Sequence, residues 1–280
     1  MRHFAALLLL GSPAFAEVHF HHLMLNSTDP AAAINFYTSR FDCEPAKFEG
    51  KQNAVWTQKS WILFNKVKTA PPSAIQSSIW HFGWGAENMP KTYQDQLAKG
   101  TKFETPITDI SDLARVPNFF YTYVSGPDGA LIELNTAGHH RFGHLHLFSA
   151  DPVSAGEWWG KHLGVKYPPA GRTPSRDIRM YRDVQVGPSA SFMLDNVNVI
   201  IFPLAYLKGS TELVSTRNRV VDHVGLSVDD LNAALAKLLS EGVKVLSPIK
   251  KLKGTNVRAA MIEGPDKLAI QLVEGHARKQ

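Results

Sequence analysis

The sequence predicts an α+β protein built from four copies of one unit, each with the order β-α-β-β-β. Four times, a histidine opens a short apolar segment that reaches an acidic or amide residue seven positions later. A helix pattern follows each segment, and strand-like runs separated by Gly, Pro and Asn turns follow each helix. Such a repeat indicates one supersecondary unit used several times, here called modules 1 to 4. The modules begin at His22, His81, His144 and His223.

The helices of the modules are of two kinds. In modules 1 and 3 an Asp-Pro pair predicts the helix start, because the Asp side chain caps free N–H groups and Pro needs no donor there. Aromatic pairs in these helices are expected to pack on the sheet. In modules 2 and 4 a glycine fits the left-handed cap at the helix end. The predicted helices are 29–41, 89–100, 151–164 and 231–242.

Apolar or alternating runs after the helices predict the remaining strands. They are 54–57 and 61–65 in module 1, 119–124 and 130–135 in module 2, 178–184, 191–194 and 197–203 in module 3, and 257–263 and 268–273 in module 4.

The first sixteen residues have the pattern of a secretory signal peptide. A basic start, a short apolar run and an Ala-x-Ala exit predict cleavage after Ala16 and a secreted or periplasmic protein. The run is shorter than the ~20 residues of a membrane span, and no later stretch approaches that length. A single cysteine, Cys43, excludes an intramolecular disulfide.

Charge and motif content exclude several classes of function. The net charge is +5, but the basic residues are scattered except for Lys250, Lys251 and Lys253, which are expected to form a solvated turn. No nucleic-acid partner is therefore predicted. The chain has no Gly-x-Ser-x-Gly elbow, no phosphate-binding loop and no complete dinucleotide fingerprint.

Paired βαβββ modules with a histidine on the first strand and a Gly-Pro-Asp turn before the last strand resemble the vicinal oxygen chelate superfamily. This superfamily includes glyoxalase I, fosfomycin and bleomycin resistance proteins and extradiol dioxygenases. The resemblance covers Val18 to Glu274, and its most specific segments are Gly126–Leu134 and Gly264–Leu272. It implies two half-barrel domains, predicted at residues 17–137 and 138–280, after the signal peptide at 1–16.

In this superfamily the first-strand histidines of paired modules and the Glu of the last strand bind a metal. Carried over to this sequence, the resemblance implies a site of His22, His81 and Glu133 in the first domain. His19 and His21 lie beside His22, which is preferred because its distance to Asp29 matches the other modules. Two imidazoles and one carboxylate suit a divalent metal ion, Fe, Mn or Zn.

The second domain would hold the corresponding set His144, His223 and Gln271, with His146 as a competitor for the first position. A neutral amide in place of a carboxylate predicts a degenerate site that binds metal weakly. The superfamily also exchanges modules between halves. If module 1 paired with module 4, His144 would replace His22 beside Glu133.

The resemblance implies a metal-dependent enzyme that acts on a small molecule with vicinal oxygens, as a lyase, an isomerase or a ring-cleaving dioxygenase. Tyr123 matches a tyrosine that contacts the substrate in extradiol dioxygenases, although the upstream histidine of their signature is absent. Export argues against the intracellular glutathione adduct of glyoxalase I. The alternative is a protein of the bleomycin-resistance type that sequesters a small molecule without catalysis. A homodimer is compatible with either function.

Overall fold

The computed structural model describes residues 18–209 and 212–279, and it has the mixed α+β content that the sequence predicts. The predicted signal peptide, residues 1–16, lies outside the described residues. Module 1 comprises β1 (His19–Ser27), α1 (Pro30–Arg40), β2 (Glu44–Phe48), β3 (Gln52–Trp56) and β4 (Trp61–Lys66). Module 2 comprises β5 (Ile79–Ala86), α2 (Met89–Ala98), β6 (Thr108–Asp109), α3 (Ser111–Ala114), β7 (Phe120–Ser125) and β8 (Leu131–Thr136).

Modules 3 and 4 repeat this order with small differences. Module 3 comprises β9 (Phe142–Ser149), α4 (Pro152–Leu163), β10 (Arg179–Tyr181), β11 (Val184–Gly187), β12 (Ala190–Leu194) and β13 (Val197–Pro203). Module 4 comprises β14 (Val221–Val228), α5 (Leu231–Ser240), β15 (Val245–Lys251), β16 (Arg258–Glu263) and β17 (Ala269–Glu274). None of the described helices is long and apolar enough to cross a membrane.

The four long helices begin where the sequence predicts. Each is preceded by a side chain that accepts a hydrogen bond from a free backbone N–H of the first turn, which stabilises the helix start. The capping residues are Asp29, Asn88, Asp151 and Asp230.

Four strands were not predicted. One of them, β11, pairs only with β10 and shares only Val184 with a predicted run, and the other three lie at the edges of the two large sheets. β2 and β15 are the outermost strands of one sheet, and β6 is an outermost strand of the other. The side chains of β2 and β15 are exposed or partly exposed except for Phe48, and β15 ends with two lysines. An edge strand needs no continuous apolar face and is often polar, so the alternation that reveals inner strands is missing.

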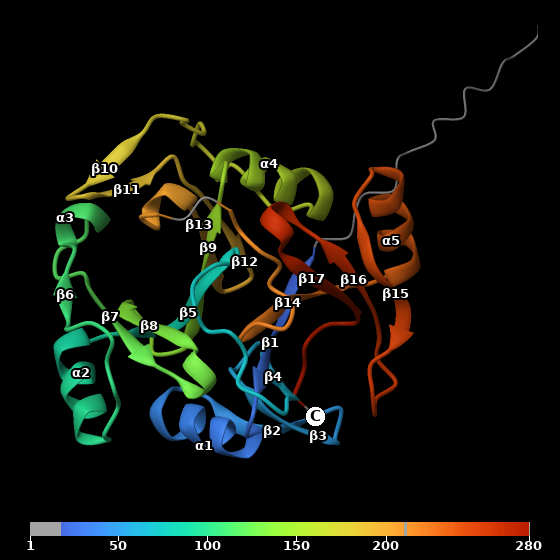
Figure 1. Ribbon diagram of the computed structural model, residues 1–280, viewed down its shortest axis with the longest axis horizontal. Coiled ribbons are helices and arrows are strands. Elements are labelled where there is room, and N and C mark those ends of the chain that lie inside the picture. Colours follow the sequence, from blue (N-terminus) through green and yellow to red (C-terminus); the bar gives the residue numbers. More distant parts are fainter. Residues whose placement is uncertain (1–17, 210–211, 280) are drawn as a thin grey trace, which may run out of the picture.

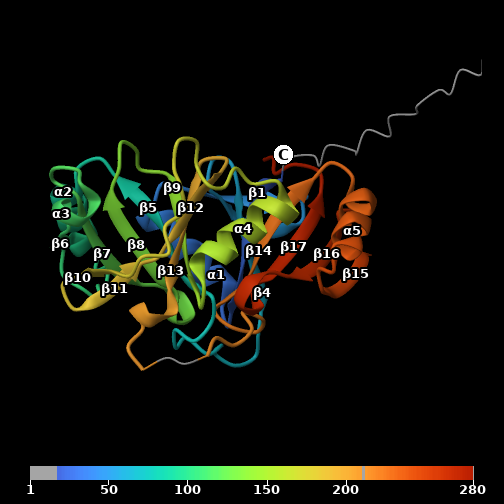
Figure 2. The ribbon, with the colours of Figure 1, turned by 90° about the horizontal axis from the view of Figure 1, so that it is seen from above.

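The strands form two large sheets and the small hairpin β10–β11 (Figure 1). One sheet has eight strands in the order β15-β16-β17-β14-β1-β4-β3-β2, and the other has seven in the order β12-β13-β9-β5-β8-β7-β6. Module 1 therefore pairs with module 4, and module 2 with module 3. In both sheets the first strands of the paired modules are antiparallel neighbours. Helices α2 and α5 lie at opposite ends of the molecule, while α1 and α4 lie nearer its middle (Figure 2).

This pairing corrects the predicted division into residues 17–137 and 138–280, because each sheet takes strands from both ranges. The lengths of the connections explain the outcome. Only residues 137–141 separate β8 from β9, which keeps module 3 beside the sheet of module 2. The longer segment 67–78 between β4 and β5 can carry the chain to the other sheet.

The two Gly-Pro-Asp turns connect the sheets to each other. Asp128, in the seven-stranded half, accepts hydrogen bonds from the backbone N–H (3.1 Å) and the hydroxyl (2.6 Å) of Thr28 in the eight-stranded half. Asp266 does the reverse and accepts from the N–H of Ala150 at 3.1 Å. Both Asp residues have a positive φ, a conformation that Asp tolerates better than most residues. The Gly-Pro-Asp turn of each half thus forms hydrogen bonds with the residue that precedes a helix cap in the other half.

An apolar core is shared by the two halves. Tyr37 of α1 is fully buried, and its ring lies 6.0 Å from that of Trp84 on β5. Phe41, just after α1, stacks on Trp84 at 4.5 Å. Since α1 belongs to one sheet's half and β5 to the other, burial of these rings stabilises both halves together. The predicted packing role of the helix aromatics is confirmed for Tyr37 and for Trp159, which is 1% exposed.

A chain cut after module 2 tests this pairing. A fragment of residues 17–137 would leave β1 without β14 and β5 without β9, and would expose their apolar faces. We expect it to show no cooperative thermal unfolding by circular dichroism, whereas residues 17–280 unfold in one cooperative transition. A cooperative transition of the fragment alone would contradict the shared core.

Candidate metal centre

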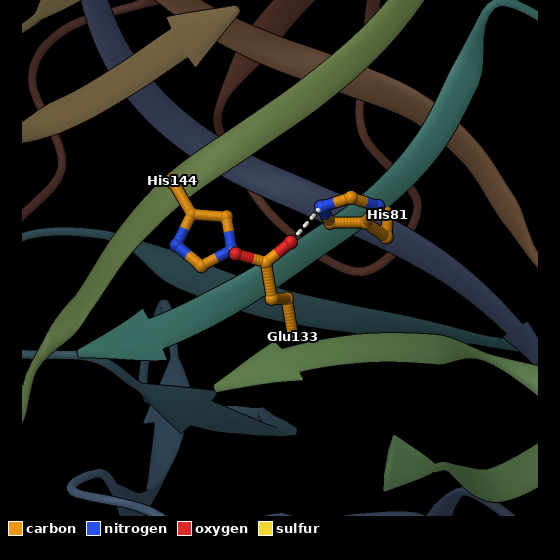
Figure 3. Close-up of side chains that lie close together, drawn as sticks. All are labelled: His81, Glu133 and His144. Carbon is orange, nitrogen blue, oxygen red and sulfur yellow. Dashed lines mark ion pairs between the residues drawn. The ribbon is translucent and has the colours of Figure 1, made fainter. Parts of the chain in front are cut away.

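Three buried side chains from neighbouring strands converge in the seven-stranded sheet. His81 comes from β5, Glu133 from β8 and His144 from β9, and their ligand atoms all lie within 4.8 Å of one another (Figure 3). His81 Nε2 is 2.8 Å from one oxygen of Glu133, and His144 Nε2 is 3.7 Å from the other. The carboxylate thus lies between two imidazoles, each at most 5% exposed.

The donor atoms of this cluster fit a divalent metal ion. Neither His81 Nε2 nor His144 Nε2 makes a hydrogen bond of acceptable geometry, although both are buried. Buried polar atoms without partners are rare, so such nitrogens point to a ligand. Two imidazole nitrogens and one carboxylate form the 2-His-1-carboxylate set that binds Fe(II) and related ions while leaving coordination positions open.

A glycine permits the close approach of the two histidine-bearing strands. Gly83 on β5 lies opposite both Glu133 and His144 in the strand register. A Cβ at this position would lie 2.4 Å from the His144 ring and 2.1 Å from the backbone oxygen of Glu133. Contacts this short are excluded, so only glycine lets the His144 imidazole lie across β5.

The protonation states suit metal binding at neutral pH. Burial lowers the pKa of His81 well below its ordinary value and lowers the pKa of His144 to about 3. Both rings are therefore neutral and have a free lone pair at pH 7. The Asn135 amide donates a hydrogen bond of 2.9 Å to Glu133, which orients the carboxylate as outer residues do in metal sites.

Tyr123 and His146 lie beside the cluster. Tyr123, on β7, is the register partner of Glu133, and its ring centroid is 5.0 Å from that of His81. Burial, and then the charge of Glu133, raise the pKa of Tyr123 well above its ordinary value. His146 Nδ1 lies 3.9 Å from Glu133, and burial lowers the pKa of His146 to about 3. Tyr123 thus stays protonated and His146 neutral near pH 7.

A cavity of about 340 Å³ opens onto this cluster. Its walls are largely aromatic and apolar, and a smaller number of polar side chains, among them Glu133, His144 and Arg179, line the rest. This combination is typical of small-molecule sites. Among the wall residues are Trp80, Phe119, Tyr121, Tyr123, Ile200, Phe202 and Tyr206.

The predicted set His22, His81 and Glu133 is not brought together. His22 lies on β1 in the eight-stranded sheet, where its Nε2 is 3.4 Å from Nε2 of His223. His144 takes its place beside Glu133, because β5 pairs with β9 and not with β1. This is the alternative pairing that the sequence left open.

The predicted second set His144, His223 and Gln271 changes in the same way. His22 takes the place of His144. Gln271 lies on β17, which pairs with β14, the strand that carries His223. One sequence signal marks these positions in retrospect. Gly83 and Gly225 each follow a module's histidine by two residues, and a Cβ at Gly225 would lie 2.0 Å from the His22 ring. The glycine indicates that a histidine of the neighbouring strand lies over it, but it does not indicate which module supplies that histidine.

Two segments of the chain match family models. Residues 19–134 match a model of the Glyoxalase/Bleomycin resistance protein/Dioxygenase superfamily, and residues 143–260 match a second model with the same description. A comparison with curated protein sequences finds no match.

Solved structures with the same architecture cover nearly the whole chain. Glyoxalase I of Zea mays superposes with a TM-score of 0.68 at 15% identity, over 92% of this chain and 92% of that chain. A Bacillus subtilis protein described as an inferred dioxygenase superposes with a TM-score of 0.61 at 10% identity, over 93% of this chain and 86% of that chain. At these identities the similarity is one of fold.

The buried histidines predict that the metal-free protein loses stability in acid. His81, His144 and His146 stay neutral when folded, whereas the unfolded chain protonates them below about pH 6.5. Stability is therefore greatest above pH 6.5 and falls as the pH decreases. Between pH 7.5 and 5.5 we expect the free energy of unfolding to drop by about 1 kcal/mol per histidine.

Urea unfolding at the two pH values measures this drop. The variant His146→Gln should lose about 1 kcal/mol less than the parent protein over the same interval, because one titrating ring is absent. A free energy of unfolding that does not change with pH would show that these rings are not buried in the neutral form.

Proposed function

Because this chain belongs to the Glyoxalase/Bleomycin resistance protein/Dioxygenase superfamily, we propose that it is a metal-dependent enzyme whose centre is formed by His81, Glu133 and His144. The observation that carries this proposal is the convergence of three buried donors at the base of an aromatic cavity. A bound Fe, Mn or Zn ion would act there as a Lewis acid and hold two adjacent substrate oxygens. We propose a small molecule with vicinal oxygens as the substrate.

The neighbouring strand of module 3 leaves room for such a substrate. Asn198, Ile200 and Phe202 are the β13 residues that line the cavity, and none of them carries a carboxylate or an imidazole. Three protein donors with no charged fourth donor from β13 would leave positions open for a bidentate ligand. The aromatic walls favour a substrate with an apolar, flat body, which stacking and burial would stabilise.

Tyr123 would supply a hydrogen bond or a proton to the substrate. Its phenol lines the cavity beside Glu133, and its raised pKa keeps the proton on the oxygen at neutral pH. A protonated phenol can donate to an oxygen that gains negative charge, but it cannot act as a base without first losing its proton. We therefore assign Tyr123 the role of donor.

Matched variants of two histidines test the metal centre. His144→Ala and Glu133→Ala should lower metal affinity by about 100-fold or more, because each removes a direct ligand where even an outer residue accounts for 10–100-fold. His22→Ala, at the equivalent strand position of module 1, should retain the metal. Elemental analysis after purification without a metal-binding tag gives the metal content. Loss of metal in His22→Ala but not in His144→Ala would contradict the assignment.

Activity assays of the metal-loaded protein identify the type of reaction. Iron-loaded protein is tested with catechols under oxygen, and zinc- or manganese-loaded protein with isomerase and lyase substrates that carry vicinal oxygens. If metal-free protein binds the same molecules as tightly as loaded protein and no turnover occurs, the sequestering function replaces the enzymatic one.

Tyr123→Phe should separate catalysis from metal binding. Removal of the hydroxyl should lower kcat by about 10²- to 10⁴-fold, the range for a positioned proton donor, with unchanged metal content. Tyr93→Phe is the matched control, because Tyr93 packs on Phe103 and is not among the residues that line the cavity. Equal activity of Tyr123→Phe and the parent protein would exclude the donor role.

A further inference from the structure

A second cavity, of about 600 Å³, lies on the eight-stranded sheet at the place equivalent to the first. Its base includes His223 and Gln271, which correspond to His81 and Glu133. Its walls combine apolar and polar side chains, and three lysines lie among its lining residues. The apolar wall residues include Met24, Phe48, Leu63, Leu252 and Met261.

The histidine rings at this base form hydrogen bonds with one another and with Asp222, unlike those of the metal centre. His21 and His22 are joined through their Nδ1 atoms at 2.8 Å, His22 and His223 through their Nε2 atoms at 3.4 Å, and His223 Nδ1 is 2.6 Å from Asp222. One arrangement of protons satisfies the row: each histidine donates to the next member, and the last donates to Asp222. The row therefore needs no metal to satisfy its ring nitrogens.

Gln271 provides the unsatisfied group in this cavity. Its side-chain oxygen is buried and has no hydrogen-bond partner, and the residue is 7% exposed. A buried acceptor without a partner destabilises the protein unless a donor reaches it. A ligand hydroxyl or N–H would be such a donor.

The rim is positively charged. Lys51, Lys250 and Lys253 line the cavity, and none of them has an ion-pair partner among the described residues. Asp222 is the one carboxylate among the described lining residues, and Arg217 binds it at 2.9 Å. The unpaired charges at the mouth are thus all positive and attract anions.

We propose that this second cavity binds a small organic anion without a metal, and that the anion carries an apolar body and a hydrogen-bond donor. The lysines of the rim attract its carboxylate or phosphate, the apolar walls cover its body, and Gln271 accepts its hydroxyl hydrogen. The site is independent of the metal centre, because its base residues come from β14 and β17 of the other sheet.

Calorimetric titration of residues 17–280 in the presence of EDTA tests this site. The probes are 4-hydroxybenzoate, benzoate, phenol and phenyl phosphate, which separate the contributions of charge, hydroxyl and body. We expect 4-hydroxybenzoate to bind most tightly, benzoate and phenyl phosphate more weakly, and phenol most weakly. No binding by any probe, or a rank order led by phenol, would overturn the proposal. A tighter fit for phenyl phosphate than for benzoate would identify the anion as a phosphate.

Matched variants locate the bound probe. The charge reversals Lys250→Glu and Lys253→Glu together should weaken 4-hydroxybenzoate by about tenfold, while Lys99→Glu and Lys102→Glu together should have no effect. Gln271→Met should weaken 4-hydroxybenzoate but not benzoate. If Gln271→Met does not fold, the charge reversals of the exposed Lys250 and Lys253 still test whether the probe binds in this cavity. Binding that is lost in Glu133→Ala, or unchanged by the Lys250 and Lys253 reversals, would place the probe elsewhere and overturn the proposal.

Discussion

The antiparallel contact between the first strands of two modules determines the rest of the structure. Where β9 pairs with β5, the imidazole of His144 occupies the space that a side chain at position 83 would need. The same contact recurs where β1 pairs with β14, with His22 over Gly225. Because backbone and ring atoms leave no space for a Cβ, each of these strand pairs requires a glycine. The pairing then decides which histidines face each other, and therefore which donors can share one ion.

The two strand pairs have the same backbone arrangement, but they differ in the charge of the side chain that the last strand brings to them. In one, Glu133 brings a negative charge between two imidazoles whose Nε2 atoms have no other partner among the described residues. In the other, Gln271 brings no charge, and the histidines bond to each other and to Asp222. A carboxylate favours a divalent cation at this position far more than an amide does. One side chain on the last strand thus distinguishes the half for which we propose a metal centre from the half for which we propose an anion site.

Much of the fold could be predicted from sequence because it depends on local signals. Capping residues such as Asp29 and Asp151 act on the N–H groups of their own helix, and the inner strands are apolar or alternating runs. Glu133 and His81 could also be identified, since the Gly-Pro-Asp turn and the histidine spacing lie within one module. The third ligand could not, because the choice between His22 and His144 depends on which distant module pairs with β5. That choice follows from connection lengths and from a core shared by both halves, which no single module contains.

The shared core also explains how the half without a carboxylate can differ in chemistry without loss of the fold. Asp128 and Asp266 each stabilise a helix start in the opposite half, and Tyr37 and Trp84 pack across the same boundary. Neither half can therefore be removed without loss of contacts in the other. The residues at the base of the second cavity take no part in these contacts. A difference there, such as Gln271 where the other half has Glu133, alters the donor set at the base of the cavity and leaves intact the interactions that hold the two halves together.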